Sequence, residues 1–215
     1  MVVNTRVGQG LYGLMLTVAV VLNAAAQTSD HPGISPSNWE RTEFEKYTKL
    51  NDAWQSKKPL AESSQAMIAG ASQALAVHAG FKALEAGGSA ADAALTTAIT
   101  QITLSGGSYV SFAGILSMVY FEKESGQVYS LNAGFAIPAN ENDGRNIPSP
   151  DTVSGRSILV PGFIAGVGAA HARFGKLPFE TLFDPAIYFA TEGVVVDRTL
   201  ARFIQNRRSH LDRFE

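Results

Sequence analysis

Residues 67–120 read MIAGASQALAVHAGFKALEAGGSAADAALTTAITQITLSGGSYVSFAGILSMVY and contain most of the local signals that specify the fold. Apolar side chains recur there at helical spacing and predict a helix over residues 73–86: Leu75, Ala79, Ala83 and Leu84. Gly87 and Gly88 follow and should end this helix, because glycine readily adopts the left-handed conformation that a helix end requires. The block therefore begins with a helix of small residues that stops at a defined point.

A second helix follows at once. Ser89 and Asp92 have the spacing of a capping box, in which the serine side chain binds a free backbone N–H and the acid binds the N–H of the serine. The helix over residues 90–103 consists mostly of Ala, Leu, Ile and Thr. Because it is apolar nearly all round, we expect it to be buried.

Beyond the Gly106-Gly107 loop, the pattern changes to that of a hairpin. Residues 115–121 predict a strand, Glu124-Ser125-Gly126 predicts a tight turn, and residues 127–131 predict the returning strand. Helices and an antiparallel hairpin in one block indicate a mixed α/β (α+β) fold.

Upstream, Ser37 and Glu40 have capping-box spacing and predict the start of another helix. Aromatic and aliphatic side chains recur along it: Trp39, Phe44, Tyr47, Leu50 and Trp54. This amphipathic helix docks either on the body of the protein or on a partner, and we favour the body.

Downstream, residues 137–154 are rich in proline, asparagine and glycine and predict a long loop. A helix is expected from Pro161-Gly162 to about residue 174. Another should run over residues 178–193, broken or kinked at Pro185. Asp197 is placed to cap a last helix.

The beginning of the chain has the pattern of a secretory signal peptide. Arg6 precedes an apolar run over residues 11–22, and Ala24-Ala25-Ala26 matches an A-x-A cleavage site. A buried or anchoring helix is the alternative, although the run is too short to span a bilayer. We therefore expect residues 1–26 to be removed and the protein to be periplasmic or secreted.

Composition excludes several function classes. The chain has 215 residues with 17 basic and 19 acidic side chains, and loss of Arg6 with the signal peptide leaves a net charge of −3. This balance gives no reason to expect nucleic acid, or a membrane after signal cleavage, as a partner. The chain has no cysteine, which excludes disulfides, a thiol nucleophile and thiolate metal ligands.

A search for catalytic or ligand-binding patterns gives only unspecific matches. The four histidines lack metal-ligand spacing, and we expect His78 and His171 to be helix-surface or hydrogen-bonded residues. Small residues at Gly166 and Gly168 indicate close helix packing rather than dinucleotide binding, and Gly175-Lys176 is no phosphate loop. Acids in predicted turns should be solvated: Glu122, Glu124, Glu141 and Asp143. We assign no catalytic residue, no metal ligand and no cofactor.

Ser108 is a candidate nucleophile. Ser108 follows Gly106-Gly107 as in a nucleophile elbow, but the closing glycine of G-x-S-x-G is missing. An independent serine hydrolase that uses Ser108 is therefore the least favoured interpretation.

Four stretches resemble the start of the large subunit of the gamma-glutamyltransferase (gamma-glutamyltranspeptidase) family. Residues 72–80 (SQALAVHAG) resemble its S-x-P-L-A-x-x-A-G helix, and residues 87–94 (GGSAADAA) its G-G-N-A-V-D-A-A. The hairpin with MVY at 118–120 and GQVY at 126–129 resembles M-L-V-Y…G-K-V-Y. Residues 155–178 (GRSILVPGFIAGVGAAHARFGKLP) resemble G-x-x-x-V-P-G-x-x-x-G…R-F-G-K-L-P, the most specific of the four.

The resemblance covers roughly residues 65–205 and implies an N-terminal-nucleophile hydrolase fold, a four-layer αββα sandwich that this chain holds only in part. Members cut themselves and expose a threonine whose amine is the base for attack on a gamma-glutamyl amide such as glutathione. No T-T-H-type motif matches here, and Thr96-Thr97 lies within a predicted buried helix. Gly134 stands where the family has a substrate-binding arginine, which implies a different acyl group.

We therefore expect three segments: a signal peptide at 1–26, a polar extension with an amphipathic helix at 27–64, and the N-terminal portion of a gamma-glutamyltransferase-like domain at 65–215. Alone, this chain is predicted to be inactive, and a second chain or a C-terminal half would complete it. The alternative is a non-catalytic exported binding module, or an inactive remnant, on the same scaffold. In that case the aromatic helix from Trp39 to Trp54 would bind the partner.

Overall fold

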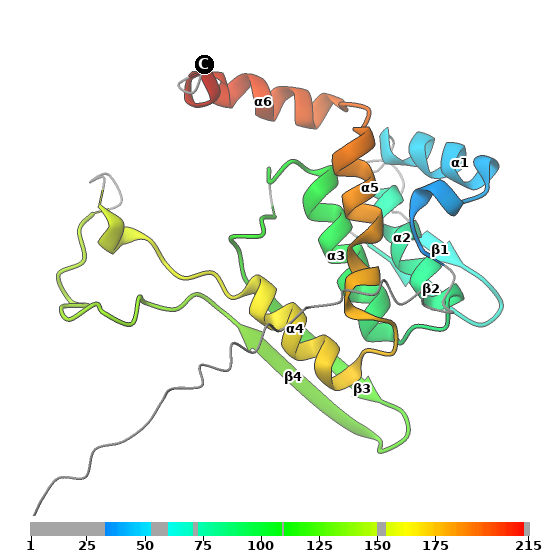
Figure 1. The fold of residues 1–215 in the computed structure, drawn as a ribbon, viewed down its shortest axis with the longest axis horizontal. Coiled ribbons are helices and arrows are strands. Elements are labelled where there is room, and N and C mark those ends of the chain that lie inside the picture. Colours follow the sequence, from blue (N-terminus) through cyan, green and yellow to red (C-terminus); the bar gives the residue numbers. More distant parts are fainter. Residues whose placement is uncertain (1–32, 53–59, 71–72, 109, 150–153, 213–215) are drawn as a thin grey trace, which may run out of the picture.

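A computed structural model describes residues 33–52, 60–70, 73–108, 110–149 and 154–212 (Figure 1). The predicted signal peptide and Trp54 lie outside these residues. The helices are α1 (Arg41–Asp52), α2 (Ala74–Glu85), α3 (Ala90–Leu104), α4 (Phe163–Phe174), α5 (Asp184–Glu192) and α6 (Arg198–Leu211). The strands are β1 (Leu60–Glu62), β2 (Met67–Ala69), β3 (Leu116–Glu122) and β4 (Gln127–Ala133), and short 3-10 turns are η1 (Pro36–Asn38), η2 (Gly155–Ser157) and η3 (Phe179–Phe183).

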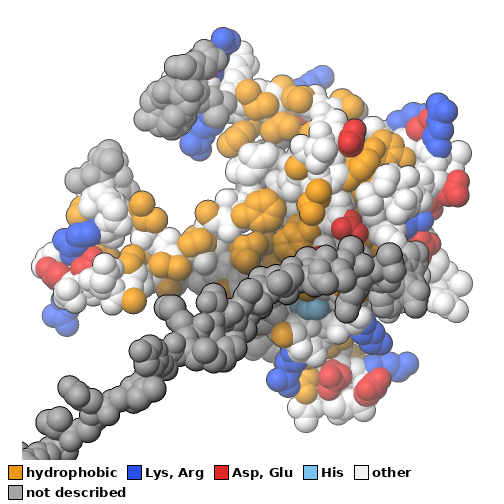
Figure 2. Space-filling view, viewed as in Figure 1, with side chains coloured by type: hydrophobic (Ala, Val, Ile, Leu, Met, Phe, Trp, Pro, Cys, Tyr) orange, Lys and Arg blue, Asp and Glu red, His pale blue; other side chains and the backbone are white. Residues whose placement is uncertain are grey.

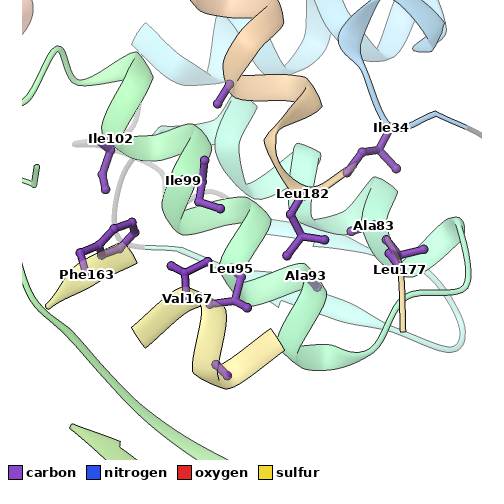
Figure 3. Packing of buried hydrophobic residues seen from close by; sticks show 12 residues of the cluster. Ile34, Ala83, Ala93, Leu95, Ile99, Ile102, Phe163, Val167, Leu177 and Leu182 are labelled. Atoms are coloured by element: carbon purple, nitrogen blue, oxygen red, sulfur yellow. The ribbon is translucent and has the colours of Figure 1, made fainter. Parts of the chain in front are cut away.

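Helix α3 lies at the centre of the packing, with α2 and α5 beside it (Figure 1). Its apolar side chains Leu95 and Ile99 are almost completely buried and lie close to Val167 of α4 and Leu182 of η3 (Figure 3). The sequence prediction of a buried helix over residues 90–103 is confirmed to within one residue.

The start of α3 is fixed by the predicted capping box. Ser89 Oγ accepts a hydrogen bond from Asp92 N (3.1 Å), and Asp92 Oδ2 accepts one from Ser89 N (2.8 Å). The same Asp92 oxygen also accepts the backbone N–H groups of Lys176 (2.8 Å) and Leu177 (3.2 Å). The capping residue of α3 therefore also holds the turn after α4, more than 80 positions along the chain.

The end of α2 follows the sequence prediction too. Gly87 has φ +88°, and Gly88 N donates to Ala83 O (2.9 Å), which is the bond of a glycine-terminated helix. The two strands β3 and β4 then pair antiparallel from Leu116↔Ala133 to Glu122↔Gln127. Both strands lie within two residues of their predicted bounds, and their pairing confirms the hairpin.

Helix α4 covers one face of this hairpin (Figure 1). Tyr120 of β3 stacks on Phe174 at the end of α4, with ring centroids 4.1 Å apart. Side chains of alternate residues point the other way and are exposed: Val119, Phe121 and Val128. Strand alternation thus gives the hairpin a second apolar face that no described residue covers.

One predicted helix start needs correction, and one predicted helix is divided in two. Ser37 caps no helix, because it lies in the 3-10 turn η1 and its hydroxyl donates to Ser35 Oγ; α1 begins only at Arg41. The predicted helix over residues 178–193 is divided into η3 and α5, with Pro185 in the first turn of α5, where proline is tolerated. The break expected at Pro185 is thereby confirmed.

The segment before β1, residues 33–52, is here called the strap. Trp39 and Tyr47 are buried against α2, and Trp39 Nε1 donates to Ile34 O (3.0 Å). Docking on the protein's own body is therefore confirmed for the described part of the aromatic helix. Within the described ranges, no helix combines the length and the hydropathy needed to cross a membrane.

Replacing Asp92 by Ala should destabilise the protein far more than loss of an ordinary helix cap. Three backbone N–H groups lose their acceptor, and we expect a loss of about 3–5 kcal/mol, since each unsatisfied buried donor costs about 1–3 kcal/mol. Urea denaturation measures this change. The control is Asp197→Ala, which removes one N-cap bond to Leu200 N (2.7 Å) and should cost about 1 kcal/mol. Equal losses would show that the long-range bonds of Asp92 contribute nothing.

Candidate functional site

A pocket of about 410 Å³ lies where the end of α3, the loop before β3 and the start of α4 meet. We call it the hairpin pocket. Figure 2 shows apolar side chains gathered over this region and along the loop that extends from it. Its lining residues are Ala98, Gln101, Ile102, Val110, Ser111, Ala113, Gly114, Ile115, Phe135 and Phe163.

Backbone hydrogen bonds join the segments around the pocket. Gly114 O accepts the N–H groups of Gly162 and Phe163, both at 3.1 Å, so the loop before β3 caps the start of α4. Ala136 and Val160 exchange two backbone bonds of 3.0 and 2.8 Å in an isolated antiparallel bridge. Main-chain contacts therefore join the segments around the pocket.

Close approach of α4 to the hairpin depends on glycine. A Cβ atom on Gly166 would lie 2.6 Å from Ala133 Cβ and 3.1 Å from Leu116 Cβ. The predicted close packing is confirmed for Gly166. It is wrong for Gly168, where an added Cβ would meet nothing within 4 Å.

The pocket has an electrically neutral lining. None of its lining residues is charged, and its two aromatic residues are the buried Phe163 and the half-exposed Phe135. Ser111 contributes a hydroxyl group, which accepts a hydrogen bond from Ala113 N (3.1 Å). Such a lining suits an apolar or uncharged polar group and offers a carboxylate no positively charged partner.

Gly134 lies between the end of β4 and the pocket residue Phe135. An added Cβ there would come no closer than 3.6 Å to Asn132 Oδ1, and the φ angle of Gly134 is outside the left-handed region. A larger side chain could therefore stand at this position without displacing the backbone.

The other predicted candidates do not assemble into a catalytic group. Ser108 does not line the pocket, and no described histidine donates to or accepts from its hydroxyl. Thr96 is completely buried within α3, and Thr97 Oγ1 donates to Ala93 O (2.8 Å), so both are packing residues. Among the described residues, no three His, Asp or Glu side chains lie together as a metal site would require.

The acids in turns differ from one another. Glu122 accepts hydrogen bonds from Ser125 and Tyr129 near the hairpin turn. Glu141 instead forms a two-point ion pair with Arg156, with Nε and Nη2 each 2.8 Å from a carboxylate oxygen. Hydrogen bonding to Arg156 lowers the pKa of Glu141 to about 2. The prediction of a merely solvated acid is therefore wrong for Glu141, because Arg156 approaches from 15 positions along the chain.

The two histidines that the sequence places on predicted helices, His78 and His171, also differ. His171 Nε2 donates to Leu177 O (2.8 Å), as predicted for a hydrogen-bonded histidine. His78 is neither exposed nor hydrogen-bonded: it is buried between the rings of Trp39 and Tyr47. Sequence spacing could not predict this, because both rings belong to the strap.

Comparison with known proteins assigns the family. The family model described as Gamma-glutamyltranspeptidase matches residues 76–215, which is most of the chain. This chain belongs to the gamma-glutamyltranspeptidase family. The match includes α3, the hairpin, α4 and every residue that lines the hairpin pocket.

Individual relatives agree with this assignment. Scoloptoxin SSD14 of Scolopendra dehaani is 34% identical over 62% of this chain, and glutathione hydrolase 3 of Arabidopsis thaliana is 30% identical over 68%. Each alignment covers 23% of the relative, so this gamma-glutamyltranspeptidase-family chain spans about a quarter of their length. The transpeptidase CapD of Bacillus anthracis has the same fold over 65% of this chain and 44% of its own, with 28% identity and a TM-score of 0.53.

These relatives confirm the expected fold class. The chain is α+β, and its helices and hairpin are part of the N-terminal-nucleophile hydrolase sandwich of the gamma-glutamyltranspeptidase family. The division into segments at residues 26 and 64 stays a prediction.

Two glycines of α4 provide a matched test of whether this helix depends on close contact with the hairpin. Gly166→Ala should lower the free energy of unfolding by about 1–3 kcal/mol, because the new methyl group overpacks against Ala133 and Leu116. Gly168→Ala, in the same helix, should be neutral or stabilise it by up to about 1 kcal/mol. Thermal or urea unfolding of both variants measures the difference. Equal effects would mean that α4 does not depend on close contact with the hairpin.

Proposed function

We propose that this chain is the N-terminal portion of an exported enzyme that transfers or hydrolyses amide-linked acyl groups. The nucleophile is an N-terminal threonine in sequence that this chain does not include, and this chain alone is inactive. Family membership supports the chemistry, because relatives are named as a glutathione hydrolase and a transpeptidase. No metal or cofactor is needed, since the threonine and its own amine provide nucleophile and base.

The neutral hairpin pocket carries the more specific part of the proposal. Its lining contains no arginine or lysine, and Gly134 stands where the family resemblance places an arginine for the substrate carboxylate. An ion pair between guanidinium and carboxylate is among the stronger polar contacts in proteins. We therefore propose that the preferred acyl group is one without a free α-carboxylate, rather than a gamma-glutamyl group.

The exposed face of the hairpin supports a missing partner. Val119, Phe121 and Val128 lie side by side on it and are 61–75% exposed. An apolar strand face of this kind is normally covered. We propose that it packs against the rest of the complete protein, on the same polypeptide or on a second chain.

The alternative of an exported binding module receives less support. Its docking element was the aromatic helix, but Trp39 and Tyr47 are buried against α2 of the same chain. These side chains are not available to a partner while the strap is docked.

The coding DNA provides the first test. We expect the reading frame to continue beyond the codon for Glu215 and to encode a T-T-H-type motif whose threonine becomes the new N-terminus. Sequencing the source DNA in this region measures it. A stop codon, with no such motif in the neighbouring frames, would contradict the enzymatic proposal and favour the inactive binding module.

Substrate preference should depend on residue 134 in the complete enzyme. Wild type should cleave an anilide of an acyl group that lacks the α-carboxylate better than the gamma-glutamyl anilide. Gly134→Arg should raise kcat/KM for the gamma-glutamyl anilide by about 10- to 100-fold, because a charge-assisted bond contributes about 1.5–3 kcal/mol. Initial rates of anilide release measure both.

A matched control separates position from charge. Gly155→Arg adds the same side chain away from the pocket, at a glycine where an added Cβ meets nothing within 4 Å. It should leave the preference unchanged. A wild-type preference for the gamma-glutamyl anilide would contradict the proposed acyl specificity but not the reaction class.

A further inference from the structure

The strap covers one buried histidine of the body. It comprises residues 33–52, and the part of the chain that matches the family model begins only at residue 76. His78, in the first turns of α2, is 1% exposed and lies beneath the strap. The Tyr47 ring stacks on its imidazole at 4.0 Å between centroids, and Trp39 contacts it edge-on at 4.6 Å.

The imidazole of His78 has no hydrogen-bond partner for either ring nitrogen among the described residues. Its Nε2 lies 3.6 Å from Glu43 Oε2, which is beyond hydrogen-bonding distance. A neutral imidazole can occupy such an aromatic site at modest cost. A charged imidazolium would lose its hydration, and the attraction of Glu43 offsets this loss only in part.

The charged groups around His78 come from both helices. From α1, Glu43 and Lys46 face it, and from α2 its own neighbour Lys82 does. The Lys82 ammonium group already pairs with Glu43, at 2.8 Å, and with Glu85, also at 2.8 Å. The carboxylate nearest to His78 is therefore occupied by a lysine. From α5, Phe189 contacts Trp39, and Tyr188 packs against the same cluster.

We propose that the strap is a pH-dependent latch, which is docked at neutral pH and released in mildly acidic solution when His78 takes up a proton. Release would uncover the buried surface of α2 and α5 that Trp39, Phe44 and Tyr47 now cover. The proposal concerns this chain alone and stands apart from the proposed enzymatic activity.

The direction of the pH dependence follows from His78 itself. Burial lowers the pKa of His78 from 6.5 to about 4 in the docked state; Glu43 opposes this shift, and Lys82 and Lys46 add to it. A released strap exposes the imidazole, which then binds a proton near pH 6.5. The docked state is therefore fully favoured above pH 6.5 and loses stability as the pH falls toward 4, by a factor on the order of 100.

Glu43 does not produce this response. Although burial alone would raise the pKa of Glu43, its bond to Lys82 lowers that pKa below 4.5. Glu43 thus stays ionised through most of the interval in which His78 changes charge.

Hydrogen exchange of the backbone amides tests the latch in the full chain. Between pH 7.5 and 4.5, protection of the α1 amides (Arg41–Asp52), corrected for intrinsic exchange, should fall by about 10- to 100-fold. Amides of α3 are the internal reference and should keep their protection. Constant protection of α1, or a parallel loss in α3, would overturn the proposal.

Substitutions assign the response to a residue. His78→Phe keeps an aromatic ring between Trp39 and Tyr47 but cannot take up a proton, so protection of α1 should become independent of pH. His171→Gln, on α4, should keep the wild-type response. Persistence of the response in His78→Phe would overturn the proposal. Should that variant not fold, His78→Leu gives the same test. In the wild type alone, a loss of α1 protection with its midpoint below pH 4 would also overturn the proposal.

Discussion

The side chain of Asp92 determines how the two halves of the helical body meet. It is fully buried, and one of its oxygens accepts three backbone N–H groups, from Ser89, Lys176 and Leu177. The first N–H groups of a helix have no acceptor within the helix, and backbone N–H groups in a tight turn between helices lack acceptors in the same way. The carboxyl group of Asp92 accepts hydrogen bonds from N–H groups at both places, and it thereby holds the start of α3 against the end of α4.

The shape of the hairpin pocket depends on these hydrogen bonds of Asp92. With the turn after α4 held at Asp92, the other end of α4 is held by Gly114 O, which accepts the N–H groups of Gly162 and Phe163. Between these two ends, Gly166 lets the helix lie directly on the hairpin. The pocket is thus a space between elements that are each fixed by the backbone.

Features that depend on neighbouring residues were predicted well from the sequence, whereas features that depend on long-range contacts were not. The capping box of Ser89 and the helix end at Gly87 depend on residues within five positions, so their spacing was sufficient to predict them. The same spacing at Ser37 failed, because Trp39 Nε1 binds Ile34 O and the chain there forms a 3-10 turn. The burial of His78 could not be predicted, since its surroundings come from another helix.

The candidate site shows the same contrast between local and long-range features. No pattern in the sequence brings Phe135 to α3, because only the tertiary fold joins them, whereas the family resemblance drew attention to its neighbour Gly134. The structure adds a physical distinction between glycines. Gly166 is required, because any side chain there would collide with the hairpin. Gly134 is not required, because its backbone and its surroundings accept a Cβ. Packing therefore does not explain glycine at position 134, and this agrees with the proposed preference for an acyl group without a free α-carboxylate.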